Sequence, residues 1–187
     1  MVRLTLLIFA AVALVQAQTP GPAAGLEPSW DIAVVLNEIG ENASRLLPAL
    51  SKLDPQAWAA KGASETYREQ LQVSKEQARA VSDAAQLLSK NPERLAVSLE
   101  PAFRIEGLEK ILLSVQEAAR RYQGPVSAQG VEIVYAEGGA NRERFRSYIV
   151  NLAAEREHQF EVMDREAQRC RGTLMAPTPP KTTGRKK

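Results

Sequence analysis

A regular pattern of apolar and small side chains runs through residues 64–90, which read SETYREQLQVSKEQARAVSDAAQLLSK. Its members recur at alternating steps of four and three residues: Tyr67, Leu71, Ser74, Ala78, Val81, Ala85 and Leu88. This spacing places them on one face of an α-helix, as in the seam of a coiled coil. Because small side chains let a neighbouring helix approach closely, we expect this seam to pack within the chain rather than between two copies.

The segment before this helix carries a similar stripe between residues 30 and 53. Its apolar members follow the three-and-four spacing of a helix: Ile32, Val35, Leu36, Ile39, Ala43, Leu46, Leu50 and Leu53. Ser29 is the expected N-cap, and Asp31 favours the first turn by its negative charge. Pro48 lacks a backbone donor, so we expect it to bend or split this helix.

A short connector joins these two helices. Asp54 and Pro55 are a cap and first-residue signal for a new helical turn, which carries Trp58 and is interrupted at Gly62. We expect Trp58 to close one end of the helical domain. The alternative is that its ring protrudes as an anchor for an interface.

Two further helical segments follow Asn91. Apolar stripes predict a long helix that is bent at Pro101 and ends at Gly124. Residues 126–136, VSAQGVEIVYA, contain a patch of β-formers, but the sequence offers no second strand to pair with it. A lone strand leaves its backbone groups unpaired, so we predict a short helix there.

The last long helix is predicted from Arg142 to about Arg171, with Asn141 as its cap. Its apolar stripe is Phe145, Ile149, Leu152, Ala153, Phe160, Met163, Ala167 and Cys170. We expect this stripe to face the core, so that Cys170, the one cysteine of the chain, is a buried thiol. The alternative is a thiol that pairs two copies of an exported chain.

Together these patterns predict an all-α fold. We expect an antiparallel bundle of about four long helices with short helical connectors, forming a single domain over residues 29–174. About 150 residues are enough for one domain with its own core. Short connections between long helices favour antiparallel neighbours.

The two ends of the chain have a different composition. Residues 1–17 combine Arg3, an apolar run and Val15-Gln16-Ala17, a pattern typical of a cleavable signal peptide. The apolar run is too short to span a bilayer, so we expect no transmembrane anchor after cleavage. Residues 18–28 are predicted to be a disordered linker and residues 175–187 a disordered basic tail. The chain is therefore expected to be exported, as a periplasmic or secreted protein.

The charge balance gives no sign of a nucleic-acid partner. Lys and Arg number 24 against 22 Asp and Glu, a net charge of +2. Such a small excess produces no strong positive field, and no nucleic-acid binding is expected.

One pair of residues has the spacing of a metal site. Glu155 and His158 form Glu-x-x-His, which places a carboxylate and an imidazole one turn apart, as in di-metal helical bundles. His158 is the only histidine, and it lies roughly 150° around the helix from the apolar stripe. Metal binding is therefore not favoured, and we expect no cofactor. The sequence also shows no nucleophile motif and no phosphate-binding loop, so we do not expect an enzyme.

Arg156 falls inside the apolar stripe of the last helix. A buried guanidinium needs a carboxylate, and Glu106 or Glu109 could supply one, forming a speculative ligand site. The alternative is that the stem of Arg156 covers the core while its head reaches water.

Two functions remain open on these observations. The preferred one is an exported, non-enzymatic helical module that binds an envelope or secreted protein, or a second copy of itself. The alternative is a bundle that holds a small ligand or a metal in its interior.

Overall fold

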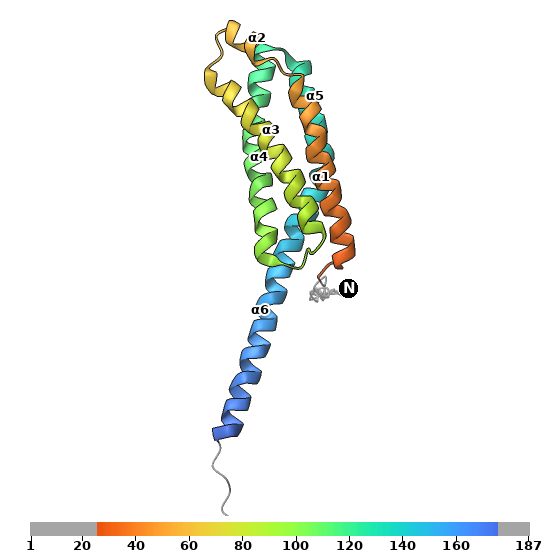
Figure 1. Cartoon of the computed structure of the whole chain (residues 1–187), viewed down its shortest axis with the longest axis vertical. Coiled ribbons are helices and arrows are strands. Elements are labelled where there is room, and N and C mark those ends of the chain that lie inside the picture. The colour runs from red at the N-terminus through yellow and green to blue at the C-terminus, as the bar shows by residue number, and fades with distance from the viewer. Residues whose placement is uncertain (1–25, 176–187) are drawn as a thin grey trace, which may run out of the picture.

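The computed structural model describes residues 26–175, and these residues form six helices (Figure 1). The helices are α1 (Ser29–Ser51), α2 (Pro55–Ala60), α3 (Glu65–Ser89), α4 (Leu95–Tyr122), α5 (Pro125–Glu137) and α6 (Gly139–Met175). No strand occurs within the described residues, and the predicted all-α class is confirmed. The predicted signal peptide, residues 18–25 of the predicted linker and residues 176–187 of the predicted tail lie outside the described residues.

Four columns of helix stand side by side and alternate in direction (Figure 1). The chain rises through α1, crosses at α2, descends through α3 and rises again through α4. The fourth column descends through α5 and continues directly into α6, with only Gly138 between them. Packing of α5 against both α1 and α4 closes the bundle. The predicted antiparallel bundle is thus confirmed, with the fourth column shared by two helices.

Several helix ends follow from local chemistry that the sequence shows. The Asp54 carboxylate accepts hydrogen bonds from the backbone N–H groups of Gln56 and Ala57, both at 3.0 Å, and Pro55 is the first residue of α2. Gly124, at φ +114°, occupies a left-handed conformation that strains any other residue and separates α4 from α5. The predicted connector and the predicted break at Gly124 are confirmed.

Two predicted caps are wrong. Ser29 is already the first residue of α1, and Pro28 holds the cap position without a side-chain hydrogen bond. Asn141 lies inside α6, which begins at Gly139, and its amide donates to the Glu38 carboxylate at 2.7 Å. In both places the helix begins before the residue that was expected to cap it.

Pro48 does not split α1, which was one of the two outcomes expected for it, because the helix continues through it to Ser51. A proline this close to the end removes only one backbone hydrogen bond and leaves the preceding turns intact.

Residues 126–136 are helical, as predicted, and form most of α5. Their β-forming side chains are accommodated because α5 packs on α1 and α4 rather than on another strand.

The core lies where the stripes of α1 and α3 meet. All eight stripe residues predicted between residues 30 and 53 are buried. Six of the seven seam residues of α3 are buried, and Tyr67 is half-buried at the rim. The small residues Ser74, Ala78 and Ala85 are all fully buried, so the seam packs within the chain as predicted.

The outer part of α6 leaves the bundle. The helix is 37 residues long, but its buried residues are only Phe145, Tyr148 and Leu152. Beyond Arg156 it projects from the lower end of the bundle as a single helix (Figure 1). We call residues 157–175 the arm; every side chain of the arm except Gln159 is exposed. The prediction that the whole α6 stripe faces the core is therefore wrong for its second half.

Candidate functional site

Glu155 and His158, the weak metal candidate in the sequence, have separate surroundings. Glu155 accepts a hydrogen bond from the Gln159 amide at 2.7 Å, and His158 is exposed. Among the described residues, no group of three or more His, Cys, Asp or Glu side chains lies close enough to hold a metal ion.

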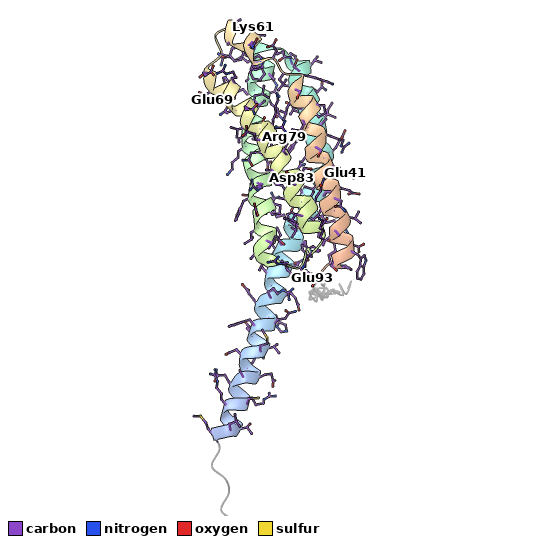
Figure 2. The ribbon with its side chains drawn as sticks, viewed as in Figure 1. Glu41, Lys61, Glu69, Arg79, Asp83 and Glu93 are labelled. Carbon is purple, nitrogen blue, oxygen red and sulfur yellow. The ribbon has the colours of Figure 1, made fainter. Side chains whose placement is uncertain are left out.

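Arg156 does not pair with Glu106 or Glu109. Its guanidinium donates to the Gln159 side chain at 2.8 Å and to the backbone carbonyl of Glu93 at 3.2 Å. The side chain is exposed, as in the alternative in which its head reaches water. Arg156 lies at the lower rim of the bundle, next to the loop labelled by Glu93 in Figure 2, so no buried partner is needed.

Glu106 and Glu109 face a different arginine, Arg142, which was predicted only as the start of the last helix. Glu106 lines a groove together with Arg142 and Arg146. Burial lowers the pKa of Arg142 below its ordinary value, and the negative charge of Glu109 opposes this shift. Arg142, which is half-buried, therefore shares the surroundings of these two carboxylates in place of Arg156, although it forms no ion pair with either of them. The sequence held a signal for this, since Arg142 precedes Phe145 by three residues and shares its face of the helix.

Arg142 ties three helices together. It donates to the backbone carbonyl of Tyr135 at 2.8 Å and to the side-chain oxygen of Asn42 at 3.3 Å. Its guanidinium lies 3.7 Å from the centre of the Tyr135 ring, a cation–π contact. The buried Asn42 amide in turn donates to the carbonyl of Val134 at 2.7 Å. The Asn42 amide and the Arg142 guanidinium thus donate to other groups of the protein, while the Tyr135 hydroxyl has no hydrogen-bond partner.

The cavity beside this cluster is too small for a ligand. It measures about 10 Å³ and is lined by Asn42, Tyr135, Arg142 and neighbouring core residues. That volume is about the room needed by one water molecule. The α4–α6 groove that contains Glu106 is larger, at about 170 Å³, but remains below the roughly 300 Å³ at which small-molecule pockets begin. These dimensions favour a structural role for the cluster.

Trp58 closes the upper end of the bundle and does not protrude. It is 1% exposed, and its indole N–H donates to the Gln123 side chain at 3.1 Å. The same Gln123 oxygen also accepts from the backbone N–H of Asp54 at 2.9 Å. The expectation that Trp58 closes the end of the bundle is therefore confirmed, and the alternative of a protruding interface anchor is wrong.

The arm carries the most unusual surface of the described chain. Its stripe, which we call the arm stripe, consists of Phe160, Met163, Ala167, Cys170 and Leu174. Phe160 is 68% exposed, Met163 62% and Leu174 86%. Cys170 is exposed as well, so the predicted buried thiol is wrong. Figure 2 shows side chains standing free on all sides of the arm, away from the other helices.

The base of the arm adjoins the bundle through a groove. Leu95, Ala153, Arg156, Glu157, Phe160 and Glu161 line it, and its volume is about 400 Å³. The groove joins the exposed stripe of the arm to the buried face of α6. A single apolar face thus runs from the core of the bundle into solvent.

The ion pairs of the arm lie on its outer side. Arg165 pairs with Glu161 at 3.9 Å and Arg169 with Glu166 at 3.2 Å, both between neighbours one turn apart. Such pairs support a solvated helix by a few tenths of a kcal/mol each. They help to explain how the arm stays helical without a core to pack on.

Comparisons with protein-family models, with curated proteins and with solved structures found no match to this chain. Across residues 26–175, none of the helices combines the length and the apolar character needed to cross a bilayer.

Proposed function

We propose that this protein is an exported, non-enzymatic helical module that acts through protein–protein interaction, with the arm as its binding element. The observation that carries the proposal is the arm stripe, which no described residue of the bundle covers. The bundle serves as the scaffold that presents the arm.

The physical argument rests on the cost of exposing large apolar side chains. Covering a residue such as Phe160 or Met163 stabilises a complex by about 1.5–3 kcal/mol. An amphipathic helix with a free apolar face is also the form in which many helices enter a groove on a partner protein. The arm meets this description, because Phe160, Met163 and Leu174 share one face while most of its charged residues occupy the others.

The interior offers less support for the ligand-binding alternative. The guanidinium of Arg142 is bonded to Asn42 and to the Tyr135 carbonyl, and the cluster around it adjoins a cavity of only about 10 Å³. We therefore base the proposal on the outside of the molecule.

A photo-crosslinking amino acid placed at Phe160 tests the interaction in the cells that make the protein. We expect a covalent protein adduct from position 160 and none from position 165. Arg165 serves as the control because it lies roughly 180° around the helix from the middle of the arm stripe, at 100° per residue. Equal adducts at both positions, or no adduct at Phe160, would contradict the proposal.

The export part of the proposal rests on residues 1–17 and has its own test. The intact mass of the protein recovered from the cells that make it should correspond to a start at Gln18. A start at Met1 would contradict export and leave the interaction proposal to be judged by the crosslinking result.

A further inference from the structure

We propose that the occupant of the arm stripe is a second copy of this chain, whose arm binds antiparallel to the first. This inference rests on the proposed interaction function and names the partner of the same surface. Three observations carry it: the distribution of charge along the arm, the pairing state of the charges beside the stripe, and the position of the bundle relative to the stripe.

Charge is distributed unevenly along the arm. Residues 157–164 carry three acidic side chains and no Lys or Arg: Glu157, Glu161 and Asp164. Residues 165–175 carry three arginines and one glutamate: Arg165, Glu166, Arg169 and Arg171. A second arm laid antiparallel places the acidic half of each copy against the basic half of the other. A parallel arm would place the two acidic halves together and the two basic halves together, which is unfavourable apart from the contact of Arg171 with Glu166.

Along one edge of the arm stripe the charged residues have no internal partner, whereas Glu166 on the other edge pairs with Arg169. Asp164 follows Met163 and Arg171 follows Cys170, so both lie along the same edge of the stripe. Neither forms an ion pair with another described residue, whereas the arginines at 165 and 169 do. In a two-fold antiparallel pair the same edges of the two helices face each other. With the axis between residues 167 and 168, Asp164 of each copy faces Arg171 of the other.

The spacing of the stripe suits this pairing. Its residues recur at steps of three and four, as the seam of a two-stranded coiled coil requires. With the axis at that position, the small residues Ala167 and Cys170 meet near the centre and let the helices approach closely. Met163 of one copy then lies against Cys170 and Leu174 of the other.

The bundle itself excludes the parallel arrangement. Phe145 and Leu152 are buried against the other helices, so the bundle lies on the stripe side of α6. In a parallel pair each bundle would occupy the space of the other copy's α6. An antiparallel pair separates the bundles to opposite ends, and residues 160–175 of the two arms overlap. The assembly closes with two-fold symmetry, as most homodimers do.

Sedimentation equilibrium of the purified full chain tests the pairing over a concentration series. We expect a monomer–dimer equilibrium that Met163→Glu weakens by at least about 100-fold, because each dimer would bury two carboxylates in its seam. Val162→Glu is the matched control. It lies roughly 120° from the middle of the stripe and should leave the association unchanged. A wild-type chain that stays monomeric throughout overturns the inference.

Charge reversal tests the direction and the register. Asp164→Arg and Arg171→Asp should each weaken dimerisation by about tenfold, since two exposed ion pairs become two repulsions. The double variant should restore the wild-type affinity, because the pairs are re-formed with their signs exchanged. A parallel pair would not be restored, since Asp at position 171 would then face Glu166 of the other copy. Failure of the double variant to recover overturns the antiparallel arrangement.

A photo-crosslinker at Met163, used in the producing cells, separates this inference from the function it rests on. An adduct to residues 170–174 of a second copy supports both. An adduct to a different protein, or to residues 176–187 of the same chain, overturns self-association; the first of these leaves the interaction function standing. No protein adduct at all overturns both.

Discussion

The bundle part of α6, residues 139–156, and the arm carry one continuous apolar stripe in opposite surroundings. In the bundle part, Phe145, Tyr148 and Leu152 are buried against neighbouring helices. In the arm, Phe160, Met163 and Leu174 are more than half exposed. The two regions have the same spacing of apolar residues and the same helical backbone. What differs is whether any neighbour reaches them.

This difference shows that helical periodicity identifies which face of a helix is apolar but does not identify what covers that face. A bundle supplies coverage only over the length of its shortest columns. Here α1 has 23 residues, α3 has 25 and α4 has 28, whereas α6 alone has 37 and follows directly on α5. The excess length must extend beyond the neighbouring helices.

The largest expected difference between the two regions is in the cost of removing an apolar side chain. Leu152→Ala should lower the free energy of unfolding by about 2–5 kcal/mol, because it leaves a cavity in a packed core. Met163→Ala in the arm should change it by less than about 0.5 kcal/mol at concentrations that keep the protein monomeric. Urea denaturation followed by tryptophan fluorescence measures both. Equal losses would mean that the arm is packed on something in the monomer.

Replacing a glycine by alanine should have opposite effects on stability in the two regions, because the space around the added Cβ differs. A Cβ at Gly138 would lie 2.4 Å from the Asn42 side-chain oxygen, so Gly138→Ala should destabilise the bundle by about 1–3 kcal/mol. Gly172 in the arm has no atom within 4 Å of that position, so Gly172→Ala should stabilise the arm helix by about 0.5–1 kcal/mol. Denaturation should report the first change. Slower amide exchange confined to the arm should report the second.

The smallest expected effect is the response of the bundle to alkaline pH. Burial raises the pKa of Tyr135 above its ordinary value of 10.0, and its hydroxyl has no hydrogen-bond partner. The unfolded chain therefore loses this proton first, and the free energy of unfolding should be constant below about pH 10 and fall above it.

Tyr135→Phe isolates the contribution of that hydroxyl. The variant should match the wild type within about 0.5 kcal/mol near neutral pH, since no hydrogen bond is lost. It should lose less stability than the wild type above pH 10. Part of the alkaline loss should remain, because burial also raises the pKa of Tyr148. Identical pH profiles for the two proteins would show that Tyr135 does not contribute.

Most of the fold could be predicted because its signals are local. The Asp54-Pro55 connector, the small-residue seam of α3 and the stripe of α1 depend on residues within a few turns of one another. The candidate site could be predicted only in part. The sequence placed Phe160, Met163 and Cys170 on one face correctly, but assigned that face to the core.

The arginines of α6 show the same limit of prediction from sequence. Arg156 and Arg142 both lie on the apolar face of α6, and Arg156, for which burial and exposure were both left open, lies at the solvent-exposed rim. Arg142 is half-buried because Asn42 of α1 and Tyr135 of α5 meet it there. These contacts join Arg142 to Asn42, which is 100 positions away in the chain, and to Tyr135, which is 7 positions away. They also require Gly138, because a side chain at that position would collide with Asn42 and Arg142.

Amino-acid order alone fixed where each helix forms and which side of it is apolar, because turns, caps and a 3.6-residue period are properties of neighbouring residues. The tertiary structure settled how far the bundle extends along α6, which arginine is enclosed and which half of one stripe remains uncovered. These outcomes depend on the relative lengths and positions of helices that are distant in the chain, and on how much of α6 those helices can reach.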